Sequence, residues 1–77
     1  MTQHDEGYYA ILDAKYARII EAISQIHHIS LEDAMDLFYN SDIQQLMSEG
    51  VADLHCRSDL YLAEEAWNEH MAIEQRK

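Results

Sequence analysis

The sequence DEGYYAILDAKYARIIEAISQIH, residues 5–27, contains the strongest periodicity in the chain. Its apolar residues recur at intervals of three and four, which is the repeat of one face of an α-helix. Asp5 and Glu6 lie where carboxylates interact favourably with the helix dipole. We therefore predict a helix from about Asp5 to His27, roughly 35 Å long, which spans the molecule or reaches a partner. The stripe comprises Tyr9, Leu12, Tyr16, Ile19, Ile23 and Ile26, and Ile11 and Ile20 widen it.

Three further helices are predicted from residues that favour helix ends. Ser30 precedes acids, and its hydroxyl can accept a hydrogen bond from a free amide of the first helical turn. This helix should end near Asn40, and Ser41 should begin the next one. Gly50 should end that helix, because glycine takes the left-handed conformation without penalty. Ser58 should begin the last helix.

The apolar residues of these helices show which side should face a core. We expect Leu31, Ala34, Met35, Leu37 and Phe38 to point inward from the second helix, and Leu60, Ala63, Trp67 and Met71 to share one face of the last. The third carries Ile43, Leu46 and Met47. Residues 51–57 are either a further helical turn or a connector.

The composition agrees with an all-α fold. The chain has 77 residues, two glycines and no proline, so it lacks both the turn residues of a β-rich domain and the glycine cluster of a phosphate-binding loop. Hydrophobic residues make up 48% of it, which is typical of a globular protein rather than an acidic tail. We predict one helical domain, residues 1–77, with four helices in the order long, short, short, long. Residues 1–5 and 74–77 are expected to be frayed.

The net charge of −10 is unevenly distributed. No Lys or Arg lies between Arg18 and Arg57, whereas that segment contains Glu21, Glu32, Asp33, Asp36, Asp42, Glu49 and Asp53. Such a surface steers toward a basic partner and repels nucleic acid, although the charge can also serve solubility alone. The helix lengths of residues 30–49 resemble a DNA-binding helix-turn-helix, but its second helix would bring acids and no Lys or Arg to the phosphates, so we predict no nucleic-acid binding.

The histidines and the cysteine are the residues of this chain most suited to bind zinc. His27, His28, His55 and Cys56 are weak candidates for a zinc site, because their spacing lacks paired ligands and adjacent helical residues diverge by about 100°. The interpretation we favour is a histidine pair at a helix C-terminus and no metal or other cofactor. Cys56 is expected to be a small buried apolar residue, because its acidic neighbourhood does not favour a thiolate.

The aromatic residues divide between a core and a surface. Phe38 and Trp67 are expected in the core, whereas Tyr8, Tyr39 and Tyr61 lie off the main stripes or at helix ends and are candidates for exposure. Tyrosine offers large contact area at small entropic cost. The predicted partner-binding patch is Glu32, Asp33, Asp36, Tyr39 and Asp42.

Localisation is predicted from two features. A single cysteine cannot form an internal disulfide, which favours the cytosol. The polar, acidic residues 1–6 and the absence of about 18 consecutive apolar residues predict neither a secretory leader nor a membrane span.

The segment ISLEDAMDLFYNS, residues 29–41, resembles a family of small bacterial proteins of unknown function. The later pairs Leu54-His55 and Tyr61-Leu62 also fit that pattern, which covers roughly residues 16–67. The resemblance implies a compact helical domain with no established activity and no site residues to carry over. Relatives encoded near toxin-like enzymes of the ADP-ribosyltransferase kind would imply an antitoxin or accessory role.

These observations lead to one leading hypothesis and two alternatives. We predict a non-enzymatic, acidic protein-interaction module of the bacterial cytoplasm that binds a protein with a basic surface. The first alternative is a structural homo-oligomer, such as a homodimer, paired through the long first helix. The second is a small metal-binding protein that uses the histidines and the cysteine.

Overall fold

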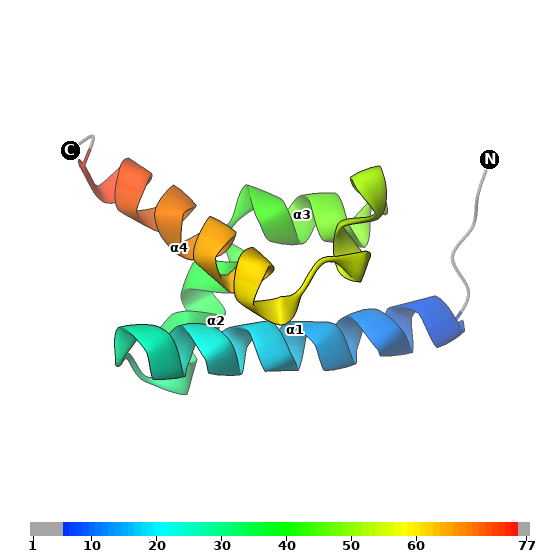
Figure 1. The fold of residues 1–77 in the computed structure, drawn as a ribbon, viewed down its shortest axis with the longest axis horizontal. Helices are drawn as coiled ribbons and strands as arrows, with labels where there is room; N and C mark the ends of the chain where they lie inside the picture. Colours follow the sequence, from blue (N-terminus) through cyan, green and yellow to red (C-terminus); the bar gives the residue numbers. More distant parts are fainter. Residues whose placement is uncertain (1–5, 76–77) are drawn as a thin grey trace.

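The long first helix, α1, runs from Glu6 to His27 and lies along one side of the molecule (Figure 1). The computed structural model describes residues 6–75, with the side chains of residues 6, 8, 9, 52 and 75 left aside. The longest dimension is 39 Å. A helix of 22 residues is roughly 33 Å long, so α1 spans most of the molecule.

Four more elements complete the described residues. They are α2 (Leu31–Tyr39), α3 (Asp42–Ser48), the 3₁₀ helix η1 (Val51–Cys56) and α4 (Asp59–Gln75). No strand occurs among residues 6–75, so the predicted all-α class and the order long, short, short, long are confirmed. Residues 51–57, left open between a helical turn and a connector, are mostly η1. Residues 74 and 75 belong to α4, and residues 1–5, 76 and 77 lie outside the described range.

The predicted capping residues begin and end these helices. The Ser30 hydroxyl accepts a hydrogen bond from the Asp33 amide, and the Ser41 hydroxyl accepts one from the Gln44 amide, at 3.0 and 3.2 Å. Gly50 follows α3 with φ of 74°, a left-handed conformation that glycine adopts without a Cβ clash. These local interactions explain why the helix boundaries could be located from the sequence.

The core lies where α1 packs against α2 and α4. From α1 it takes four residues of the predicted stripe together with Ile20, whereas Ile26 is exposed and the Tyr9 side chain lies outside the described residues. Phe38 is fully buried and Trp67 packs against the core, as expected. The buried apolar residues are Leu12, Tyr16, Ile19, Ile20, Ile23, Ala34, Leu37, Phe38, Met47, Leu62, Ala63 and Ala66.

The inward face of α4 agrees with the prediction at Ala63 and Trp67 and differs from it at Leu60. Leu60 is exposed, whereas Leu62 and Ala66 are buried beside Ala63. Asp59 is on the same side of α4 as Leu62 and Ala63, three and four positions along, and its carboxylate pairs with Lys15 of α1. The ion pair and the buried apolar residues therefore favour the same orientation of α4.

Candidate interaction surface

The outer face of α2 carries four of the five residues predicted to bind a partner. Glu32, Asp33, Asp36 and Tyr39 are all exposed. Ala34, Leu37 and Phe38 occupy the opposite side of the helix and are buried. The anchoring of that apolar side to α1 and α4 fixes the acids in an outward position.

Asp42, the fifth predicted residue, lies at the start of α3 and is also exposed. Its backbone amide donates to both carboxylate oxygens of Glu69 on α4, at 2.6 and 2.7 Å. Glu69 therefore satisfies a free amide at the start of α3 and holds that end against α4. This contact could not be predicted from the sequence, because the two residues are 27 positions apart in the chain.

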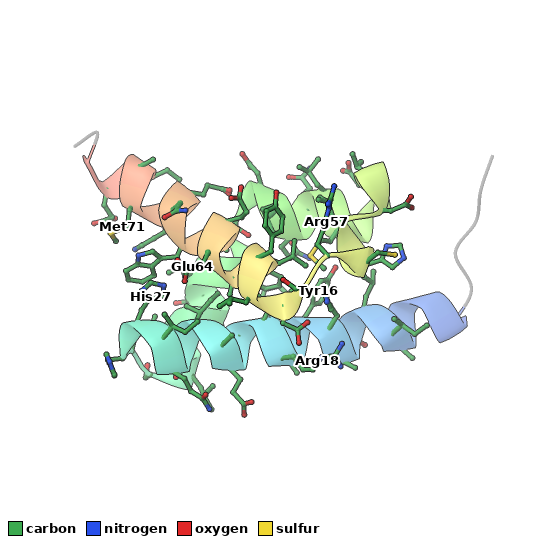
Figure 2. The ribbon with its side chains drawn as sticks, viewed as in Figure 1. Tyr16, Arg18, His27, Arg57, Glu64 and Met71 are labelled. Carbon is green, nitrogen blue, oxygen red and sulfur yellow. The ribbon has the colours of Figure 1, made fainter. Side chains whose placement is uncertain are left out.

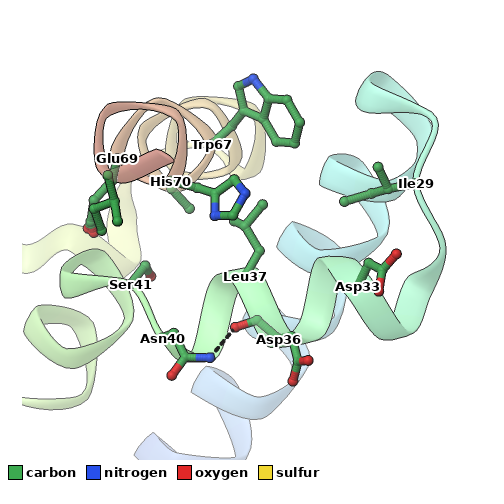
Figure 3. Close-up of a pocket in the computed structure, with 11 residues that line it drawn as sticks. Ile29, Asp33, Asp36, Leu37, Asn40, Ser41, Trp67, Glu69 and His70 are labelled. Atoms are coloured by element: carbon green, nitrogen blue, oxygen red, sulfur yellow. Dashed lines mark hydrogen bonds between the residues drawn. The ribbon is translucent and has the colours of Figure 1, made fainter. Parts of the chain in front are cut away.

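A hollow of about 470 Å³ lies between α2 and α4 (Figure 3). Leu37, Ala66 and Ile73 supply apolar surface, and Trp67 and His70 supply aromatic rings. Its polar rim includes Asp33, Asp36, Asn40 and Glu69. The Asn40 side-chain amide donates to the Asp36 carbonyl at 2.7 Å, which closes the C-terminal turn of α2.

A second hollow, of about 370 Å³, lies on the other side of α2, against α1. Its lining residues are Asp13, Ala17, Ile20, Glu21, Leu31, Met35 and Tyr39. The Tyr39 ring packs edge-on against the rings of Tyr16 and Phe38, with centroids 5.9 and 5.6 Å away. Tyr39 is thus exposed on one side and held by core aromatics on the other.

The predicted patch is therefore a continuous surface on the outside of α2 with a hollow on each side. Asp33 and Asp36 line the hollow toward α4, and Tyr39 lines the hollow toward α1. Glu32 lies on the exposed face and lines neither of these hollows, and Asp42 lies beyond the end of α2. The acids are adjacent in the chain but face different neighbours.

Leu31 and Met35 contradict the prediction that they face the core. They are 56% and 48% exposed. The apolar residues of this nine-residue helix cover a face that is broader than its contact with the core, so Leu31 and Met35 lie at the edge of the buried side formed by Ala34, Leu37 and Phe38. The excess of apolar residues in α2 was the available signal for a second contact surface.

The basic residues among residues 6–75 are engaged near the start of α4. The Asp59 carboxylate is 2.7 Å from Lys15 Nζ and 3.0 Å from Arg18 Nε, and Lys15 also donates to the Arg57 carbonyl. The Arg57 guanidinium lies 5.9 Å from the centre of the Tyr61 ring. The positions of Arg18 and Arg57 can be seen in Figure 2. The hydrogen bond from Lys15 lowers the pKa of Asp59, against the opposing effect of partial burial, and Arg18 lowers it further.

The four weak metal candidates lie in different environments. His27 Nε2 is 3.0 Å from Glu64 Oε2, and its ring stacks on Trp67 with centroids 3.7 Å apart. His28 is exposed, whereas His55 and Cys56 are on η1 and His27 is at the C-terminal end of α1. Within the described residues, no three His, Cys, Asp or Glu groups are placed to hold a metal ion.

His28 and Cys56 each have a clear structural position. His28 has φ of 56°, and the Ile29 amide donates to the Ser24 carbonyl at 3.2 Å, which is the pattern of a helix closed by a left-handed residue. Cys56 is exposed, so the prediction of a buried residue is wrong. Leu54 makes the core contact from η1 instead.

Tyr39 and Tyr61, two of the three tyrosines that were candidates for exposure, can be compared with the structure. Tyr39 and Tyr61 are exposed, and the Tyr8 side chain lies outside the described residues.

Among residues 6–75, no helix combines the length and apolar character needed to cross a membrane.

Comparisons with known families, with curated proteins and with solved structures found no match to this chain. The resemblance of residues 29–41 to a small bacterial family therefore stays a prediction.

Proposed function

We propose that this protein is a non-enzymatic interaction module that binds a protein with a basic surface through the outer face of α2 and the start of α3. The observation that carries the proposal is the joint exposure of Glu32, Asp33, Asp36, Tyr39 and Asp42 on a segment without Lys or Arg. The described cations are gathered near the start of α4 instead.

The chemistry of this face suits a protein partner. Carboxylates that have no cationic neighbours raise the local negative potential and speed association with a basic surface. Tyr39 adds a large side chain whose conformation is already restricted by Tyr16 and Phe38, so little entropy is lost on binding. The acids would supply steering, and Tyr39 would supply contact area.

The more specific form of the proposal is an antitoxin-like or accessory protein of the bacterial cytoplasm. An exposed free thiol at Cys56 is compatible with a reducing compartment, where such thiols persist. The resemblance of residues 29–41 suggests the toxin-type enzyme as the partner. In this role the module covers a basic surface and performs no chemistry itself.

The test is recovery of a partner from the host that encodes the protein. Tagged protein is captured at about 50 mM and about 500 mM salt, and the bound proteins are identified by mass spectrometry. We expect a basic protein that is retained at low salt and lost at high salt, because screening shortens the range of exposed charges. Recovery of the tagged protein alone at both salts would contradict the proposal.

A matched pair of variants assigns the partner to α2. The variant E32Q/D36N removes two exposed charges from the proposed face, and D53N/E65Q removes two exposed charges elsewhere. We expect the first to reduce recovery at least fivefold and the second to change it less than twofold. Equal losses would show that net charge alone governs binding.

A homo-oligomer through α1 is the second candidate. Ile11 and Ile26 favour it, because they remain 60% and 42% exposed on this helix. The central part of the stripe, Leu12 to Ile23, is already packed inside the chain, so pairing would have to use these outer residues. Light scattering at tens of micromolar tests it, and a monomer would remove this candidate.

A further inference from the structure

The hollow between α1 and α2 is bordered by two regular stripes of side chains. On α1 the stripe is Asp13, Ala17 and Glu21, and on α2 it is Leu31, Met35 and Tyr39. Both have the four-residue spacing that places side chains in line along a helix. Ile20 also lines the hollow, and we call these seven residues the α1–α2 groove.

The α2 side of the groove is more apolar than a protein surface requires. Leu31, Met35 and Tyr39 are 56%, 48% and 48% exposed and succeed one another along the helix. Single exposed apolar residues are ordinary, but contiguous ones mark contact surfaces. Methionine is flexible and polarisable, which suits contact with an apolar side chain from another molecule.

The charged residues that line the groove are all acidic. Asp13 and Glu21 stand at the two ends of the α1 stripe, and Glu32 is exposed on α2 next to the apolar stripe. No Lys or Arg is among the groove residues. An occupant must therefore offer apolar side chains in a row with positive charges beside them.

We propose that the α1–α2 groove binds an amphipathic helix of the partner protein, with its apolar face on Leu31, Met35 and Tyr39 and its Lys or Arg residues beside the acids. The inference rests on the proposed function and names the surface and the kind of segment bound. A stripe over residues 31–39 is about 12 Å long, which matches two turns of a helix that presents residues i, i+3 or i+4, and i+7.

Charge argues against a second copy of this chain as the occupant. Each copy carries a net charge of −10, and a copy seated in the groove would bring its own charge toward Asp13, Glu21 and Glu32. Like charges brought together at an interface are unfavourable. A basic segment gains from the same potential that would repel the copy.

The test uses a synthetic probe because the natural segment is not identified. The probe is an 18-residue helical peptide of leucine and lysine with all leucines on one face, and a matched peptide carries glutamate in place of every lysine. Binding to the full chain is followed by amide chemical shifts. We expect the lysine peptide to shift Ala17, Ile20, Leu31, Met35 and Tyr39 most, and the glutamate peptide to leave them unchanged.

Two variants distinguish binding in the groove from nonspecific binding to exposed apolar residues. L31S/M35S removes apolar area from the groove, and V51S/L60S removes two exposed apolar residues elsewhere. We expect the first to weaken binding of the lysine peptide at least tenfold and the second less than twofold. All four side chains are exposed, so both variants should keep the helical circular dichroism of the parent.

Several outcomes overturn the inference. The inference is wrong if the glutamate peptide binds as well as the lysine peptide, or if the lysine peptide does not bind. It is also wrong if L31S/M35S binds the lysine peptide as tightly as the parent does. A chain that is dimeric by light scattering and becomes monomeric in L31S/M35S would assign the groove to a second copy. If the lysine peptide instead shifts residues around Asp33, Trp67 and His70, the groove inference fails but the proposed function stands. A partner absent from the capture experiment would count against the proposed function itself.

Discussion

Asp59 joins the first and last helices through Lys15 and Arg18, and its effect on stability can be measured directly. Lys15 is only 11% exposed at its side chain and Asp59 34%, so the pair lies between surface and buried behaviour. We expect D59N to lower the free energy of unfolding by about 1–2 kcal/mol at pH 7. Urea unfolding measures it, with D53N as the exposed control, which should change stability by less than about 0.5 kcal/mol.

The same carboxylate predicts a pH dependence. Its pKa is lowered in the folded protein, so its stabilising effect is complete above the pKa of an unfolded aspartate, about 3.9. The effect is lost as the pH falls through the lower, folded pKa. The stability difference between the parent and D59N should therefore shrink from pH 7 to pH 2. A difference that stays constant over this range would show that the Asp59 ion pair is not its cause.

His27 and His28 are adjacent but should respond oppositely to substitution. His27 stacks on Trp67 and contacts Glu64, so H27A should cost about 1–2 kcal/mol of unfolding free energy. Because Trp67 is the only tryptophan, its fluorescence should also move to longer wavelength as the ring becomes wetter. An unchanged emission spectrum would contradict the stack.

His28 has a left-handed backbone that glycine adopts more readily. We expect H28G to raise the free energy of unfolding by about 0.5–1 kcal/mol, because the Cβ clash is removed at an exposed position. Urea unfolding is the measurement. Destabilisation by H28G would show that the histidine side chain contributes to the helix end beyond its backbone conformation.

At the scale of helices, the two serine caps of α2 and α3 should differ in strength. The Ser41 hydroxyl accepts from the Gln44 amide and donates to the Phe38 carbonyl in a buried position, whereas Ser30 is exposed. S41A should cost about 2 kcal/mol and S30A about 1 kcal/mol, because S41A removes both the cap and a buried hydrogen bond to the Phe38 carbonyl, to which the Ser41 and Asn40 amides still donate, whereas S30A removes an exposed cap alone. Equal effects on the urea midpoint would contradict this order.

Helix boundaries were predictable because their causes are local. Serines, Gly50 and the apolar repeat act within a few residues of each other, so residues 5–27 sufficed to place α1. Which side of α2 and of α4 is buried in the core was not predictable in the same way. It depends on contacts between helices that are distant in the chain, such as the packing of Leu62, Ala63 and Ala66 and the pairing of Asp59 with Lys15.

The candidate site was predictable in part for the same reason. Exposure of Glu32, Asp36 and Tyr39 follows from charge and helix position, and the structure confirms it. The groove could not be derived, because Asp13 and Glu21 come from another helix and Leu31 and Met35 were assigned to the core. A prediction from one helix identifies its outward residues but not the neighbour that makes them a groove.

For the whole molecule, the net charge of −10 should have opposite effects on folding and on binding. Self-repulsion among exposed acids destabilises the compact chain, and salt screens it. Raising salt from about 10 to about 150 mM should raise the thermal midpoint of the free protein by a few degrees, given that about 1 kcal/mol corresponds to roughly 4–8 °C in a domain of this size. Differential scanning calorimetry measures the change.

Binding of the lysine peptide should weaken over the same change in salt, because the attraction between the acidic groove and the lysines is screened as well. The two salt effects therefore have opposite signs if the acids serve recognition. If they serve solubility alone, salt should raise the thermal midpoint and leave peptide affinity within about twofold, since an apolar contact does not depend on screening. Titration of the peptide at both salt concentrations, on the same samples used for calorimetry, shows whether the acidic residues contribute to binding or only to solubility.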